Sequence, residues 1–85
     1  MKNVVVFGDK TSHGGTVISA SSTFEIEGKN AALLHDMVSC EEHGPNRIIE
    51  CEPGYEEQGK GIVVHLCKTE CGSVVYASLA AAGFE

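Results

Sequence analysis

The chain carries the unit His13-Gly14-Gly15-Thr16-Val17-Ile18 and repeats it as His43-Gly44-Pro45-Asn46-Arg47-Ile48-Ile49 and as Cys71-Gly72-Ser73-Val74-Val75. Each copy consists of a His or Cys, a glycine, two or three small or polar residues, and a β-branched pair. A second unit precedes the later two copies, because residues 28–36 (GKNAALLHD) match residues 59–67 (GKGIVVHLC). Repeats with a period of about thirty residues predict that the same local structure is built several times.

The first residue of each copy is a possible metal ligand. If the copies are arranged around one axis, His13, His43 and Cys71 converge on it. Cys40 lies three residues before His43, and this C-x-x-H spacing lets one loop hold a metal with two side chains. Two imidazoles and two thiolates suit a tetrahedral zinc ion, although the ligand types also leave iron open.

The other cysteines and histidines have less certain roles. Cys67 lies four residues before Cys71 and is either a small buried apolar residue or a substitute for Cys71 as a ligand. We interpret His65 and His35 as packed strand histidines, with His65 as a further alternative ligand. Cys51 is interpreted as a strand residue without a metal role.

Two short motifs invite a catalytic interpretation. Asp9 and Asp36 each follow an expected strand and precede a turn, so we expect their carboxylates to bond backbone N–H groups rather than to form an acid–base pair. Gly14-Gly15 is not followed by the lysine of a phosphate-binding loop. A tight turn that needs positive φ or a close backbone approach explains these glycines better.

Length and charge limit the possible functions. Eighty-five residues predict a single small domain over residues 1–85, which needs a staple such as a metal because its core is small. The net charge of −6 argues against binding to nucleic acid or to anionic membranes. No signal peptide is recognisable, so we expect synthesis in a reducing compartment, which favours thiolates on a metal. The even number of cysteines keeps a module with two disulfides as an alternative.

The spread of glycines between β-rich runs predicts an all-β fold with many turns. We expect turn or loop structure at Pro53-Gly54 and Glu56-Glu57-Gln58, and either one helical turn or a frayed end at residues 78–82. The repeat favours a strand over a helix for residues 30–35, despite their Ala-Ala-Leu-Leu sequence. The other expected strands are Val4–Phe7, Thr16–Ala20, Thr23–Ile26, Arg47–Cys51, Gly61–His65 and Val74–Ala77.

Three ordered motifs together resemble the PAAR-repeat family. They are Gly8-Asp9-Lys10-Thr11-Ser12-His13-Gly14-Gly15, residues 36–44 (DMVSCEEHG) and residues 68–73 (KTECGS). The resemblance extends from about Val4 to about Ala77. The name-giving Pro-Ala-Ala-Arg segment is present here as Asn30-Ala31-Ala32-Leu33, without its arginine.

The resemblance implies a small cone of short strands with internal pseudo-threefold symmetry and a structural zinc at its apex. By resemblance, the metal ligands are His13, Cys40, His43 and Cys71. The implied function is a non-enzymatic tip that caps and sharpens the trimeric VgrG β-helical spike of a type VI secretion system, one copy per trimer. Such a protein is made in the bacterial cytoplasm and exported on the spike, and it contacts the target membrane only mechanically.

We expect no effector extension, so that any effector carried by this tip binds non-covalently. The alternative functions are a zinc hydrolase, which needs an open ligand position and a general base, and a small secreted module stapled by zinc or disulfides. The cognate spike, the effector and the target cell are not encoded in any recognisable motif.

Overall fold

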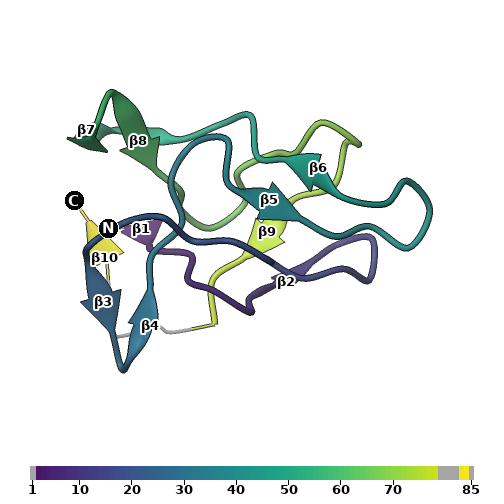
Figure 1. The fold of residues 1–85 in the computed structure, drawn as a ribbon, viewed down its shortest axis with the longest axis horizontal. Helices are drawn as coiled ribbons and strands as arrows, with labels where there is room; N and C mark the ends of the chain where they lie inside the picture. The colour runs from purple at the N-terminus through teal and green to yellow at the C-terminus, as the bar shows by residue number, and fades with distance from the viewer. Residues whose placement is uncertain (1, 79–82, 85) are drawn as a thin grey trace.

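A computed structural model describes residues 2–78 and 83–84. The strands are short and pair in antiparallel twos, and the molecule measures 32 × 24 × 20 Å (Figure 1). No helix is present in the described part of the chain, and so none with the length and hydropathy of a membrane span. The strands are β1 Lys2–Asn3, β2 Lys10–Thr11, β3 Glu25–Ile26, β4 Lys29–Asn30, β5 Met37–Val38, β6 Asn46–Arg47, β7 Glu52–Glu57, β8 Lys60–Ile62, β9 Val75–Tyr76 and β10 Gly83–Phe84.

A closed ring of three backbone hydrogen bonds lies at the centre of the fold. The N–H of Val5 donates to the carbonyl of Val63, the N–H of Val63 to Ala32, and the N–H of Ala32 to Val5, each at 2.9 Å. Three segments that are far apart in sequence therefore meet around one axis in equivalent positions. This ring confirms the expected internal pseudo-threefold arrangement.

Each central segment ends in the same tight turn. The N–H groups of Asp9, Asp36 and Cys67 donate to the carbonyl three residues earlier, at 3.1, 2.9 and 3.1 Å. The residue before each of them has positive φ, at 87° for Gly8 and 73° for both His35 and Leu66. Each turn directs the chain out of the ring into a loop that carries the ligand residues.

Three two-stranded ribbons spread at the broad end of the molecule. Two are hairpins, β3–β4 and β7–β8, whose turns have positive φ at both central residues, Glu27-Gly28 and Gln58-Gly59. The third ribbon pairs β1 with β10, so that the two ends of the chain replace a hairpin (Figure 1). Lys2-Asn3 matches Lys29-Asn30 in sequence, so that the β1–β10 ribbon extends the repeat to the chain ends.

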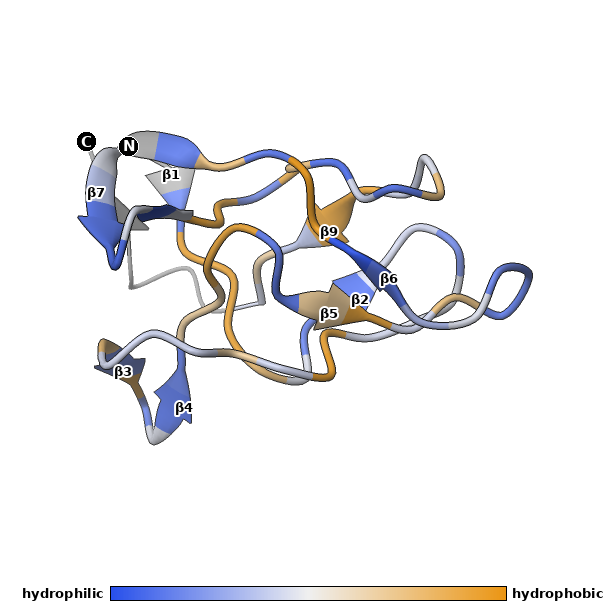
Figure 2. Cartoon of the chain, turned by 45° about the horizontal axis from the view of Figure 1, so that its top comes forward, coloured by the Kyte–Doolittle hydropathy of each residue, from blue (hydrophilic) through white to orange (hydrophobic). Residues whose placement is uncertain are grey.

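The hydrophobic core surrounds the ring, at the place where the three repeats meet. Figure 2 shows hydrophobic segments in the interior, with hydrophilic ribbons and loops toward both ends. The core is built mainly from small β-branched residues, which suit short, closely packed strands. Its members are Val4, Val5, Val17, Ala31, Ala32, Leu33, Val38, Ile48, Ile62, Val63, Val64, Cys67 and Val75.

The all-β prediction is confirmed, but one expected loop is wrong. Pro53-Gly54 and Glu56-Glu57 lie inside β7, which pairs with β8 across a register shift between Glu52 and Glu56. This irregularity accommodates a proline that a regular strand interior excludes. The turn lies at Gln58-Gly59 instead, and the helical turn expected at residues 78–82 falls largely outside the described residues.

The expectation for two histidines is also wrong. His35 and His65 are exposed and lie in the tight turns, not packed within strands. The ring of His65 lies 5.9 Å from that of Tyr76 between centroids, and its Nδ1 accepts the N–H of Ala77. The apolar runs that contain these histidines suggested longer strands, but the chain turns at both positions.

Candidate metal centre

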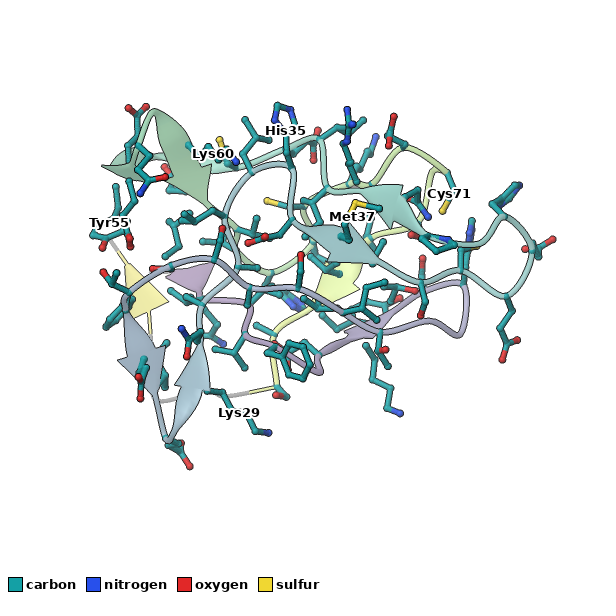
Figure 3. All side chains as sticks on the ribbon, viewed as in Figure 1. Lys29, His35, Met37, Tyr55, Lys60 and Cys71 are labelled. Atoms are coloured by element: carbon teal, nitrogen blue, oxygen red, sulfur yellow. The ribbon has the colours of Figure 1, made fainter. Side chains whose placement is uncertain are left out.

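The three loops opposite the ribbons bring the ligand residues together. His13 lies in the turn that follows β2, Cys40 and His43 lie in the loop between β5 and β6, and Cys71 lies in the turn before β9. These loops form the end of the molecule farthest from the ribbons (Figure 1). Figure 3 shows Cys71 near this end, away from Tyr55 and Lys60 at the broad end.

Glycines make the tight loop ends possible. Gly14, Gly44 and Gly72 directly follow a ligand in each repeat, and their φ angles are 78°, 74° and 89°. A side chain is disfavoured in this left-handed region. Gly15 serves a different need, because a Cβ there would lie 1.8 Å from the carbonyl oxygen of Ser39. The loops of the first two repeats therefore touch backbone to backbone beside the ligands.

The four candidate ligand atoms form a compact group, in which all atoms lie within 4.8 Å of one another. The Sγ of Cys40 lies 3.6 Å from Nδ1 of His13 and 3.3 Å from Nδ1 of His43, and the Sγ of Cys71 lies 3.6 Å from Nδ1 of His13. A tetrahedral zinc ion with bonds of about 2.0–2.3 Å has ligand–ligand edges of about 3.3–3.8 Å. These three distances match such edges, so the group suits a tetrahedral metal ion such as zinc.

Two hydroxyl groups support the Cys71 ligand. The hydroxyls of Thr69 and Ser73 lie 3.3 and 3.4 Å from its Sγ. Burial raises the pKa of the Cys71 thiol, but hydrogen bonds with Ser73, Thr69 and His13 outweigh that effect and lower the pKa to about 5. A thiolate near neutral pH is the form that binds a metal. These hydroxyls would also hold the sulfur in place, as outer-shell partners do in metal sites.

Thr69 and Ser73 were not among the site residues expected from sequence. One available signal was the spacing, because Thr11 precedes His13 by two residues as Thr69 precedes Cys71. In the first repeat the hydroxyl of Thr11 accepts the N–H of Gly15 at 3.1 Å. The repeated threonine thus organises the loop in one copy and contacts the ligand sulfur in the other.

All four residues expected as ligands lie together, whereas the alternative residues do not join the group. Cys67 is buried among the core residues, and the described residues give a single His, Cys, Asp and Glu group with this spacing. His65 lies in the tight turn two residues before Cys67 and is not part of the group. The geometry thus favours Cys71 as the fourth ligand.

The carboxylates of Asp9 and Asp36 have the structural role expected from sequence. Oδ2 of Asp9 accepts the N–H of Val6 at 2.9 Å, and Oδ2 of Asp36 accepts the N–H of Leu33 at 2.7 Å. Both side chains therefore close the tight turns at the ends of the central segments. Each carboxylate is buried and fully engaged in hydrogen bonds, which fits a role in the turn rather than in catalysis.

A comparison with protein families agrees with this architecture. The family model described as PAAR motif matches residues 7–77, which include all four candidate ligand residues. The chain belongs to the PAAR motif family. No curated protein shows significant similarity to it. Proteins of this family are associated with the tips of type VI secretion spikes, and the family is structural rather than enzymatic.

Proposed function

We propose that this PAAR protein is the metal-stapled tip of a type VI secretion spike and caps a trimeric VgrG-type β-helix with one copy per trimer. The observation that carries the proposal is the closed ring of Val5, Ala32 and Val63 within a PAAR family chain. A single chain with three equivalent sides can meet the three equivalent subunits of a homotrimer at once. A monomer without this internal symmetry would leave two of the three subunits mismatched.

The broad end is the docking surface in this proposal. It presents the ribbons β1–β10, β3–β4 and β7–β8, each built from two strands. The end of a trimeric β-helix leaves backbone groups unpaired, and ribbons packed against that end would cover them. Each ribbon would cover the end of one subunit.

The narrow end gives the protein its mechanical role. Loops this small cannot enclose an apolar core, and a metal held by His13, Cys40, His43 and Cys71 would join all three repeats where packing cannot. Structural zinc contributes on the order of 10 kcal/mol of apparent binding free energy that also stabilises the fold. Four protein ligands leave no open position for water, which supports a structural rather than a hydrolytic metal.

Export on the spike would take the protein from the bacterial cytoplasm to the target cell, with any effector bound non-covalently. The point would concentrate the force of contraction on a small membrane area. The acidic net charge of −6 is consistent with mechanical contact, since adsorption to anionic lipid needs basic clusters.

Native mass spectrometry of the chain mixed with a trimeric β-helical spike tests the proposal. We expect a complex of one chain per trimer that carries one metal ion. A complex of three chains per trimer would refute the symmetry argument. Binding to several unrelated trimers but no preference for the spike encoded with this chain would refute a dedicated tip.

A further inference from the structure

A second set of equivalent contacts closes each repeat on itself, away from the metal centre. The N–H groups of Val17, Ile48 and Val75 donate to the carbonyls of Asp9, Asp36 and Cys67, at 2.8, 3.0 and 3.0 Å. These three bonds place Asp9, Asp36 and Cys67 at the same position of the three repeats. They also identify the segments that follow Val17, Ile48 and Val75 as equivalents.

Two of the three positions are closed by an aspartate and serines from a neighbouring repeat. Asp9 accepts the hydroxyl of Ser78, which stands three residues after Val75. Asp36 accepts the hydroxyls of Ser19 and Ser21, both at 3.0 Å, from the segment after Val17. We call each of these contacts an Asp–Ser clasp. Each clasp holds the segment that follows one repeat against the tight turn of the next repeat.

The third position has cysteine on both sides. Cys67 replaces the aspartate, and Cys51 stands three residues after Ile48, as Ser78 stands after Val75. Cys51 and Cys67 line the same hollow of about 340 Å³, between the segment that follows Ile48 and the tight turn that ends at Cys67. Both members of the clasp have thus changed together, from an acid and a hydroxyl to two thiols.

We propose that Cys51 and Cys67 form a disulfide bond under oxidising conditions and that this bond is the third clasp. Both cysteines line one hollow, and the hydrogen bonds at the other two positions show that the equivalent segment and turn face each other there. The bond would tie the second repeat to the third through the β7–β8 ribbon. The proposal does not depend on the proposed function or on the metal.

The bond would form by two thiol–disulfide exchanges with a small disulfide oxidant. The thiolate of Cys51, the more exposed residue, attacks one sulfur of the oxidant and releases one thiol in forming a mixed disulfide. The thiolate of buried Cys67 then attacks the Cys51 sulfur and releases the second thiol. The two cysteines lose two electrons and two protons, which the oxidant receives as its two free thiols.

Charge suggests the reagent for the test. Glu50 and Glu52 also line the hollow, and the protein carries a net charge of −6. Cystamine, a cationic disulfide, should therefore react faster than the anionic oxidised glutathione. The full metal-loaded chain is treated with each reagent, and intact mass, metal content and melting temperature are measured before and after.

We expect a product two hydrogens lighter that retains its metal, and a non-reduced digest that joins the peptides of Cys51 and Cys67. The melting temperature should rise by about 5 °C or more, since the cross-link restricts the unfolded chain. Cys51→Ser should abolish the mass change and the rise. A stable mixed disulfide on Cys51 without closure, or cross-links to Cys40 or Cys71 with loss of metal, would overturn the proposal.

A variant that rebuilds the other clasps tests the same idea without a disulfide. Cys51→Ser combined with Cys67→Asp recreates the Asp–Ser pair of the first position. We expect this double variant to keep its metal, to melt near the reduced wild-type protein and not to respond to cystamine. A double variant that does not fold would contradict the equivalence of the three positions.

Discussion

The Sγ of Cys40 lies 3.6 Å from Nδ1 of His13, although 27 residues separate them in sequence. This contact joins the loops of the first two repeats, and Cys71 adds the third by lying 3.6 Å from the same nitrogen. His13 is thus the ligand that both sulfurs share as a neighbour. The candidate metal site is therefore a property of the threefold arrangement rather than of any one loop.

Removal of a ligand should release the metal and destabilise the fold. We expect His13→Ala and Cys40→Ala each to lose the metal and to lower the free energy of unfolding by several kcal/mol, because structural metal binding contributes directly to folding. Metal content by inductively coupled plasma mass spectrometry and urea unfolding measure both effects. Cys51→Ser is the matched control and should keep the metal. An unchanged stability in the ligand variants would contradict a structural metal.

The fourth ligand can be assigned by comparing two serine substitutions. Cys71→Ser should reduce metal retention during dialysis against a chelator, whereas Cys67→Ser should leave it close to that of the wild-type protein. The reason is that Cys71 lies in the ligand group and Cys67 lies in the core. The reverse order of metal retention would show that Cys67 is the ligand in solution.

The backbone contact beside the metal should be sensitive to one methyl group. Gly15→Ala places a Cβ against the carbonyl oxygen of Ser39, so the two loops must separate, at a cost of about 2 kcal/mol or more. We expect lower stability and weaker metal retention together. Gly28→Asn is the control, because it has open space and asparagine tolerates positive φ. Equal loss of stability in both variants would mean that the close contact between Gly15 and the Ser39 carbonyl does not contribute to stability.

Acid should weaken one contact between the broad-end ribbons. Hydrogen bonds from Ser22, Tyr55 and Thr23 lower the pKa of Glu57 from 4.5 to about 2. Because the pKa is lower in the folded state, this stabilisation is present above the ordinary pKa and is lost as the pH falls from about 4.5 to about 2. Unfolding measured across that range should show a smaller decrease in stability for Glu57→Gln than for the wild-type protein. Glu56→Gln, a matched loss of charge on the exposed neighbour, should follow the wild-type profile.

The clustering of the candidate ligands was predictable from sequence because the repeat makes three of them equivalent. His13, His43 and Cys71 each precede a glycine, and that pattern places them at one point of a threefold structure without knowledge of the strands. The tight turns were harder to predict. His35 and Leu66 adopt positive φ where the first repeat has Gly8, so the glycine that marks this turn is missing from two copies.

The structure of the broad end was hard to predict, because it depends on long-range contacts that local sequence does not encode. Pro53-Gly54 reads as a turn, yet pairing with β8 keeps this segment extended. The match of Lys2-Asn3 to Lys29-Asn30 is only two residues long, and it gains meaning only once β1 and β10 are seen to close the third ribbon. Long-range pairing decided both features.

X-ray absorption spectroscopy of the purified, metal-loaded chain tests the central claim of a closed tetrahedral site most directly. The absorption edge identifies the metal, which we expect to be zinc. We predict two sulfur ligands at about 2.3 Å and two nitrogen ligands at about 2.0–2.1 Å. A spectrum with an oxygen ligand from water, or with fewer than two sulfurs, would contradict a site in which His13, Cys40, His43 and Cys71 hold the tip together.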